Sequence, residues 1–463
     1  MKKLFFFIVL GAALGFIVPG CEKSPNSMEH PSSEQNELSA MMKTDQAGSV
    51  ELDMCVSFDS ETETYIFSLA VYEGKLYAGT HPGGHIYGFD GAVWSLAFDT
   101  ETETHVWSLA VYEGKLYAGT EPGGRIYVYD GTEWDVVFDS PEWHINSLAV
   151  YNGKLYAGTA DHGRIYVYDG TSWDLAFDVL DYVSLRHPTY ASHVFALAVY
   201  NGNLYAGTDC MTPPYPTGTL ASIYVYDGTT WSEAYNTGEA QVRSLGVYEG
   251  KLYAGTGWTG KIYVYDGTSW GLAYDSPTDG VYSFAVYGGN LYAGTETDGV
   301  IYSFDGSQWM TAFNSPERTV FSLAPYAGSL YAGTAEEGRI YGPCVIIVDI
   351  DIKPGSTPNS INCRNGNMII TVAILTSDDF DATVVDHTTV TFEGASEMHV
   401  NKKSGELSRH TEDVDGDGDT DLVFHFRFSD TGIECGDEEA ILTGLTFEGQ
   451  KIEGSDHIRT VGN

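Results

Sequence analysis

The chain has 463 residues, enough for two or three domains with large buried cores. It contains 53 glycines and 32 tyrosines, and 23 lysines and arginines stand against 64 aspartates and glutamates, a formal net charge of −41. This excess of carboxylates excludes nucleic-acid binding, because too few basic side chains are present to neutralise a phosphate backbone. It fits an acidic, soluble surface outside the cell. Abundant glycine and tyrosine indicate short strands joined by tight turns.

The first 21 residues have the pattern of an export signal. Two lysines follow the initial methionine, and the apolar stretch 4–18 is too short and too quickly ended for a membrane span. Its end, Val-Pro-Gly-Cys, resembles the lipobox of bacterial lipoproteins, in which a small residue precedes the lipid-bearing cysteine. The resemblance implies a lipid on Cys21 that anchors the chain to a bacterial membrane or cell surface; the alternative is an ordinary cleaved signal peptide. Residues 22–50 are polar and lack apolar periodicity, which predicts a disordered tether.

The pentapeptide Leu-Tyr-Ala-Gly-Thr is the most regular feature of the chain. Seven copies follow one another at spacings of 39 to 49 residues. This period suits a four-stranded propeller blade and is too long for a leucine-rich coil. The copies begin at Leu76, Leu116, Leu155, Leu204, Leu252, Leu291 and Leu330.

The second copy shows how one unit forms four strands. An apolar inner strand is expected at 106–112 and a second strand at 116–120, separated by a tight turn. Alternating side chains predict a third strand at 125–130. An Asp-Gly-Thr hairpin turn, in which glycine accepts positive φ, leads to an outer strand at 134–139.

An Asp-Gly turn followed by tryptophan recurs along the repeats. Examples are Asp90, Gly91 and Trp94, and then Asp169, Gly170 and Trp173. The unit therefore resembles kelch-like and Asp-box propeller repeats. This resemblance covers roughly residues 51–342 and implies a seven-bladed β-propeller, which we expect at 51–344, without implying an activity.

The seventh unit lacks its outer strand, and the beginning of the repeat region supplies a substitute. Residues 55–59 match the outer strand of the second unit in register, so they are expected to complete the last blade and remove a free edge. In the same register Cys344 takes the position of Asp130, and Cys55 takes that of Asp135. These positions face each other, which predicts a Cys55–Cys344 disulfide in an exported protein.

Six tryptophans recur at the start of the outer strand. A residue present in each of six blades at one register position is interpreted as packing between blades rather than as a ligand-stacking residue. These residues are Trp94, Trp134, Trp173, Trp231, Trp270 and Trp309.

Two insertions interrupt the repeat, between residues 178 and 194 and between 208 and 222. Connections of these two kinds emerge on the same face of a propeller, so both loops are expected side by side over blades three and four. They carry side chains suited to recognition, although drifted loops without a ligand are the alternative. The candidate ligand-binding residues are Tyr182, Arg186, His187, Tyr190, His193, Met211 and Tyr215. Cys210 in the second loop has no evident partner.

Residues 345–463 differ from the repeats and are expected to form a small antiparallel β-sandwich. Strand-like apolar runs lie at 345–352, 368–375, 422–428 and 440–445. The stretches 351–356, 372–375 and 454–456 resemble a module at the C-termini of secreted microbial surface proteins, which supports an exported location. Cys363 and Cys435 are the two cysteines within this part and are predicted to pair.

An aspartate-rich segment within this region has calcium-ligand spacing. Asp413, Asp415, Asp417 and Asp421 stand at positions 1, 3, 5 and 9, with glycine at 6, as in the first part of an EF-hand loop. Asp419 would add its backbone carbonyl. Phenylalanine occupies position 12 and an apolar strand follows, so the segment is similar to Asp-rich β-hairpin loops of integrin-like and other extracellular repeats. We expect structural calcium here, against the alternative of a solvated acidic turn.

No catalytic motif for zinc peptidases, serine hydrolases or phosphate-binding loops is present. Asp-box resemblance suggests a sialidase, but Arg125, Arg164 and Arg339 recur at the start of the third strand, which indicates an architectural role. The leading hypothesis is a non-catalytic surface protein that binds a glycan or another protein through its propeller. The alternatives are a polysaccharide lyase or glycoside hydrolase with its site at the loops of blades three and four, near His187 and His193, and a purely structural spacer.

Overall fold

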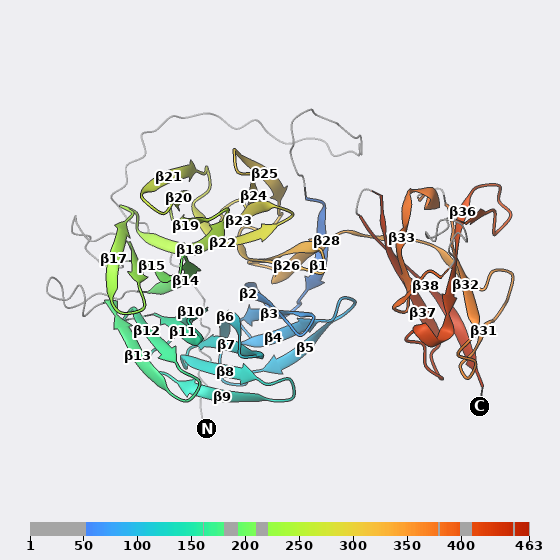
Figure 1. The fold of residues 1–463 in the computed structure, drawn as a ribbon, viewed down its shortest axis with the longest axis horizontal. Coiled ribbons are helices and arrows are strands. Elements are labelled where there is room, and N and C mark those ends of the chain that lie inside the picture. The colour runs from blue at the N-terminus through green and yellow to red at the C-terminus, as the bar shows by residue number, and fades with distance from the viewer. Residues whose placement is uncertain are drawn as a thin grey trace, which may run out of the picture. The chain divides into compact units, whose positions relative to one another are not determined.

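The computed structural model describes residues 52–160, 162–179, 193–209, 221–377, 380–398, 410–447 and 450–462. Strands dominate these residues (Figure 1), and two short 3₁₀ helices, η1 (Ala382–Val384) and η2 (Phe428–Asp430), occur near the C-terminus. The predicted all-β class is therefore confirmed. Across the ranges given above, no helix is long and apolar enough to cross a membrane. The predicted lipid site Cys21, the tether 22–50 and Cys210 lie outside these ranges.

Seven four-stranded antiparallel sheets lie between residues 54 and 343 (Figure 1), and they are called blades one to seven in the order of their inner strands. The inner strands are β2 (Tyr65–Tyr72), β6 (His105–Tyr112), β10 (Ile145–Tyr151), β14 (Val194–Tyr200), β18 (Gln241–Tyr248), β22 (Gly280–Tyr287) and β26 (Val320–Tyr326). The second strands are β3 (Lys75–His81), β7 (Lys115–Glu121), β11 (Lys154–Thr159), β15 (Asn203–Thr208), β19 (Lys251–Gly257), β23 (Asn290–Glu296) and β27 (Ser329–Thr334).

The two remaining strands of each blade complete the four-stranded pattern that the repeat predicts. The third strands are β4 (His85–Phe89), β8 (Arg125–Tyr129), β12 (Arg164–Tyr168), β16 (Ser222–Tyr226), β20 (Lys261–Tyr265), β24 (Val300–Phe304) and β28 (Arg339–Pro343). The outer strands are β5 (Trp94–Asp99), β9 (Trp134–Asp139), β13 (Trp173–Asp178), β17 (Trp231–Asn236), β21 (Trp270–Asp275), β25 (Trp309–Asn314) and β1 (Met54–Asp59).

The N-terminal strand completes the last blade. Strand β1 pairs with β28 in the antiparallel sense, and the predicted disulfide between Cys55 and Cys344 is present with a Cα–Cα distance of 4.8 Å. Each inner strand lies beside the next, and β26 lies beside β2, so the sheets form a ring. The repeated sheets, the ring and the completing strand give a β-propeller, as predicted.

Neighbouring blades approach so closely that the glycine of the pentapeptide is required. A Cβ atom on Gly119 would lie 2.5 Å from Ile145 Cγ2 in the next blade. At the opposite end of each inner strand, a tyrosine donates a hydrogen bond to a turn carbonyl in the next blade. The pairs are Tyr72 to Gly114, Tyr112 to Gly153, Tyr151 to Gly202, Tyr200 to Gly250, Tyr248 to Gly289, Tyr287 to Gly328 and Tyr326 to Gly74.

The recurring tryptophans pack between blades, as predicted. Trp134 stacks on Phe98 of the preceding blade at 4.8 Å between ring centroids and on Tyr129 of its own blade at 5.1 Å. The same arrangement repeats for Trp173, Trp231, Trp270 and Trp309. Two faces of each indole are therefore used for folding.

The third-strand arginines also have the architectural role that their recurrence indicates. Each pairs with a buried glutamate 22 residues earlier in the chain. The nitrogen–oxygen distances are 2.9 Å for Arg125–Glu103, 2.7 Å for Arg164–Glu142 and 2.8 Å for Arg339–Glu317. These buried carboxylates are satisfied within the propeller itself.

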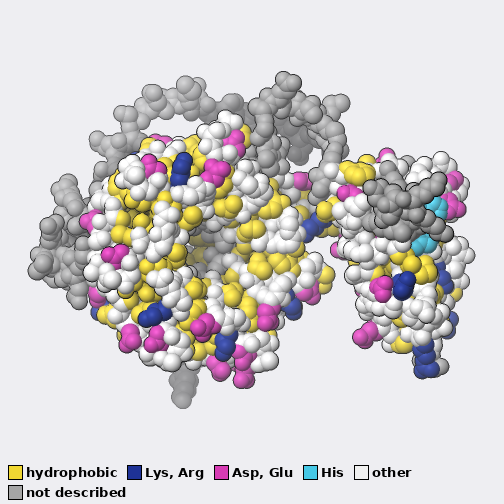
Figure 2. Space-filling model, in the orientation of Figure 1, with side chains coloured by type: hydrophobic (Ala, Val, Ile, Leu, Met, Phe, Trp, Pro, Cys, Tyr) yellow, Lys and Arg dark blue, Asp and Glu magenta, His cyan; other side chains and the backbone are white. Residues whose placement is uncertain are grey.

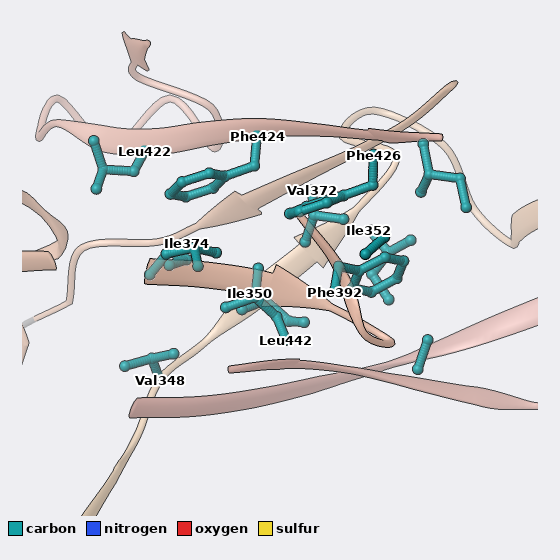
Figure 3. Close-up of a cluster of buried hydrophobic side chains, with 14 of the residues drawn as sticks. Val348, Ile350, Ile352, Val372, Ile374, Phe392, Leu422, Phe424, Phe426 and Leu442 are labelled. Atoms are coloured by element: carbon teal, nitrogen blue, oxygen red, sulfur yellow. The ribbon is translucent and has the colours of Figure 1, made fainter. Parts of the chain in front are cut away.

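Two further sheets follow the propeller strands in sequence. One has the order β29 (Val345–Ile347), β38 (Lys451–Val461), β37 (Glu439–Thr446), β33 (Val385–Phe392) and β34 (Ala395–Ser396), with β31 (Asn359–Asn362) also paired to β38. The other has the order β30 (Ile350–Ile352), β32 (Ile369–Ile374), β36 (Asp421–Arg427) and β35 (Thr411–Glu412). Their inward side chains, including Phe392, Phe426 and Leu442, form one buried cluster (Figure 3).

Two expectations for this C-terminal region need correction, and one is confirmed. The apolar run 345–352 forms two strands, β29 and β30, in different sheets, because the chain crosses between them at Val348 and Asp349. The pairing is not wholly antiparallel, since β29 and β31 both run parallel to β38. The predicted disulfide between Cys363 and Cys435 is present.

Candidate functional site

The insertion face is the end of the propeller where each inner strand begins and each second strand ends. His193 directly precedes β14, and Asp209 directly follows β15; the two side chains meet at 2.8 Å, from Nδ1 to Oδ2. His193 ends the first insertion and Asp209 begins the second, so both insertions join blade four at this face. The other candidate loop residues lie outside the described ranges: Tyr182, Arg186, His187, Tyr190, Met211 and Tyr215.

A β-bulge near the start of every inner strand supplies a second set of side chains on this face. In blade one, Ile66 pairs with Thr80 and Ser68 with Gly79, so Phe67 has no partner in the ladder. The same shift occurs in all seven blades. We call the seven bulged residues the bulge ring: Phe67, Trp107, Asn146, Phe195, Arg243, Tyr282 and Phe321.

Side chains of the bulge ring touch across blade boundaries. Phe67 stacks on Trp107 at 4.0 Å and lies edge-on to Phe321 at 5.0 Å; Phe321 in turn contacts Tyr282 at 5.0 Å. All seven residues are partly exposed. Figure 2 shows a hollow at the centre of one propeller face, with hydrophobic side chains on its margin. Five of the seven bulge-ring residues are aromatic, so the insertion face gathers partly exposed aromatic side chains.

A polar cluster centred on Glu121 adjoins Trp107. The Trp107 indole donates to Glu121 Oε2 at 2.6 Å, and His144 Nε2 lies 3.1 Å from Oε1. Hydrogen bonds from His144 and Trp107 outweigh the effect of burial and lower the pKa of Glu121. The His105 ring stacks on His81 at 3.8 Å. Burial lowers the pKa of His105 to about 4, so this imidazole is neutral at physiological pH.

Blade six presents a second carboxylate beside the bulge ring. The Tyr282 hydroxyl donates to Glu296 Oε2 at 3.0 Å, and burial raises the pKa of Tyr282 to about 12. Glu296 stands at the end of its second strand, in the same register as Glu121 in blade two. Both carboxylates therefore orient the bulge-ring residue of their own blade.

Three of the nine tryptophans stand outside the repeat register, and all three are on the insertion face. Trp107 belongs to the bulge ring, Trp143 lies just before the third inner strand, and Trp258 directly follows β19. Trp143 is 65% exposed and Trp258 is 46% exposed. Sequence reasoning missed these residues because it concentrated on the insertions. The signal was present, since aligned repeats show tryptophan only once at each of these positions.

The aspartate-rich segment lies in a β-hairpin between β35 and β36, as its resemblance implies. Carboxylate oxygens of Asp413, Asp415 and Asp421 lie within 4.8 Å of one another, as do those of Asp415, Asp417 and Asp419. Asp421 is buried and accepts hydrogen bonds from the backbone N–H groups of Val414 and Thr376, both at 2.8 Å. The donor set is made of hard oxygens, which fits calcium.

No protein-family model and no curated protein sequence matches the chain. Similarity to solved structures is confined to the fold. The extracellular domain of the putative one component system BT4673 from B. thetaiotaomicron is 14% identical with a TM-score of 0.50, over 71% of this chain and 46% of that chain. The chain therefore spans about half the length of that domain. The WD40 β-propeller domain of Doa1 is 13% identical with a TM-score of 0.45, over 63% of this chain and 96% of that domain.

Proposed function

We propose that the chain is a non-catalytic, exported glycan-binding protein whose seven-bladed propeller binds its ligand at the insertion face. The observation that carries this proposal is the bulge ring. The pentapeptide and the packing residues are repeated from blade to blade, but the bulge position differs: it is aromatic in five blades, asparagine in one and arginine in one. Packing alone gives no reason for such variation, because the same neighbouring strands surround the position in each blade.

The chemistry of the insertion face favours a sugar ligand. Aromatic faces stack on the C–H faces of sugar rings, and the exposed Trp143 and Trp258 offer such faces beside the partly exposed bulge ring. Carboxylates on the same face accept hydrogen bonds from sugar hydroxyl groups, and amides both donate and accept them. Near-identical blades also allow several weak contacts to act together.

The rest of the chain is proposed to place and stabilise this receptor. Two disulfides and the extracellular origin of a similar structure support an exported location. A lipid on Cys21 would tether the protein to a bacterial surface. The C-terminal sheets are proposed to form a β-sandwich in which the 413–421 hairpin binds structural calcium.

A glycan array probed with the full-length chain tests the binding function, followed by titration of each hit. Trp143→Ala and Trp258→Ala remove exposed aromatic faces without disturbing a core, and each is expected to weaken binding about tenfold. Val93→Ala is the matched control, because Val93 is 64% exposed on an Asp-Gly turn, away from this face. Unchanged affinity in both tryptophan variants would contradict the site.

The same samples separate a binder from an enzyme. Polysaccharide incubated with the chain is expected to keep its length distribution, as measured by size-exclusion chromatography. Shortened products that disappear in His193→Ala would instead support the lyase or hydrolase alternative. An array without any hit would favour a spacer or a protein partner.

A further inference from the structure

We infer that the glycan is acidic, with a hexuronic-acid carboxylate bound by Arg243; this inference rests on the proposed glycan-binding function. Arg243 is the bulge-ring residue of blade five. Its guanidinium carbon lies 3.8 Å from the Phe195 ring centroid and 5.2 Å from that of Tyr282. Its Nε donates to Gln241 Oε1 at 2.7 Å. Two rings and one amide thus hold the guanidinium plane.

Among the described arginines of the propeller, Arg243 is the one without a carboxylate partner in the described residues. Arg125, Arg164 and Arg339 pair with buried glutamates, and even the exposed Arg318 lies 3.9 Å from Glu336. The chain carries 64 acidic side chains, so pairing is the ordinary outcome for an arginine here. The terminal nitrogens of Arg243 retain four N–H donors in a fork that matches a carboxylate.

Blade five has no carboxylate at the position where blades two and six place one beside the bulge ring. In blades two and six, the residue at the end of the second strand is a glutamate that hydrogen-bonds the bulge-ring residue of its own blade, as Glu121 does with Trp107. The equivalent residue in blade five is Gly257. A Cβ atom there would lie 2.5 Å from Gln241 Oε1 and 3.1 Å from Arg243 Cγ. The glycine makes room for the Gln241–Arg243 pair, and no carboxylate of the described residues pairs with the guanidinium.

The surroundings of Arg243 narrow the class of anion. Phe195, Tyr282 and Phe321 are partly exposed aromatic neighbours along the ring, so the ligand needs a face that stacks beside its negative charge. A hexuronate combines a carboxylate with the C–H face of a sugar ring. The net charge of −41 opposes an anion, and salt screens the long-range part of this repulsion over about 8 Å at physiological ionic strength.

Matched sugars give the direct test. Tetramers of galacturonate, glucuronate and mannuronate, and the same tetramers with each carboxyl reduced to an alcohol, are titrated calorimetrically into the full-length chain. The wild type should bind at least one uronate tetramer about tenfold to a hundredfold more tightly than its reduced form, because charge-assisted hydrogen bonds are lost on reduction. Arg243→Gln should abolish this preference, so that the uronate tetramer and its reduced form bind with equal affinity.

Two further variants guard against a folding artefact. Arg318→Gln removes an exposed arginine and should keep the uronate preference. Gly257→Glu introduces the carboxylate of blades two and six and displaces the Gln241 amide that the added Cβ would meet, so it should abolish the preference, with a cooperative urea transition showing that the chain still folds. Equal binding of acidic and reduced tetramers, or a preference retained in Arg243→Gln, would overturn the inference and leave glycan binding intact. Absence of binding to either series and to the array would overturn both proposals.

Discussion

The Tyr326 hydroxyl donates a hydrogen bond to the Gly74 carbonyl oxygen at 2.9 Å, and these two residues are 252 positions apart. Tyr112 makes the equivalent bond to Gly153 at 2.9 Å over only 41 positions. Because the hydrogen-bond distance is the same at such different sequence separations, the last blade contacts the first blade as any two consecutive blades contact each other.

Removing either tyrosine hydroxyl should therefore have the same effect on stability. Tyr326→Phe and Tyr112→Phe each delete one hydrogen bond and leave a glycine carbonyl without its partner, which costs about 1 kcal/mol of unfolding free energy. Urea denaturation measures the unfolding free energy of both variants. A loss in Tyr112→Phe with none in Tyr326→Phe would mean that blade seven does not dock on blade one.

The Cys55–Cys344 disulfide should stabilise the propeller by joining the strand that completes blade seven. The loop-entropy relation gives about 6 kcal/mol at most for a separation of 289 residues, and the β1–β28 hydrogen bonds that remain make the observed loss smaller. The Cys55→Ser/Cys344→Ser double variant is expected to lower the urea midpoint of the propeller transition. Cys363→Ser/Cys435→Ser is the control, and it should leave that transition unchanged.

The pentapeptide glycine should tolerate no side chain. Gly119→Ala places a methyl group against Ile145 and Ser108, which should cost about 1–3 kcal/mol through overpacking. A Cβ atom on Gly271, in an outer strand, would meet no atom of the described residues within 4 Å, so Gly271→Ala should lie within about 0.5 kcal/mol of the wild type. Thermal and urea unfolding of the two variants compare a glycine that contacts the next blade with a glycine that has no close neighbour. A neutral Gly119→Ala would contradict the inter-blade contact.

Acid should destabilise the fold through the cluster around Glu121. The unfolded chain protonates His105 near its ordinary pKa of 6.5, whereas the folded protein does so only near 4. The folded state is therefore penalised progressively as pH falls from 6.5 to 4, by at most about 3 kcal/mol, and carries no such penalty above 6.5. The lowered pKa of Glu121 acts in the same direction at still lower pH.

His105→Gln should reduce the loss of unfolding free energy that occurs between pH 7 and pH 5. Unfolding free energies at pH 7 and pH 5, measured by urea denaturation, should differ less in the variant than in the wild type. His457→Gln is the control, since His457 is exposed in the C-terminal region. An unchanged pH difference in His105→Gln would show that His105 is not the group responsible.

Calcium should stabilise the C-terminal sheets through the 413–421 hairpin. Asp415 belongs to both carboxylate groups, so Asp415→Asn should abolish the rise in unfolding temperature that calcium gives, and EDTA should reverse that rise in the wild type. Asp430→Asn alters an exposed aspartate outside the hairpin and should respond as the wild type does. Equal stabilisation of Asp415→Asn would place the cation elsewhere.

Repetition explains which parts of the fold could be predicted from the sequence. Strand positions, the completing strand β1 and its disulfide follow from aligning seven copies, because each copy reports on the same local geometry. The run 345–352 offered no such comparison. Its apolar residues suit one long strand, but the chain passes from one sheet to the other at Val348 and Asp349. This crossing is set by the pairing of β29 with β38 and of β30 with β32, which the run itself does not encode.

The site was harder to predict than the scaffold, for a related reason. His105, Glu121 and His144 are spread over 40 positions and meet only because strands from two blades begin and end at one face. Arg243 was visible as a departure from the repeat, but the structure was needed to show that Gly257 lies beside it on the paired strand and that no carboxylate of the described residues pairs with it. The insertions drew attention because they are long, whereas the informative departures are single residues.

The bulges have an evolutionary consequence. Because a bulged residue takes no part in its own ladder of backbone hydrogen bonds, a mutation there leaves the sheet intact. Duplication of one ancestral repeat would have produced a ring of identical blades, which would discriminate little between ligands. Later single substitutions at these seven bulge positions would then change ligand selectivity gradually, while the propeller fold stays the same.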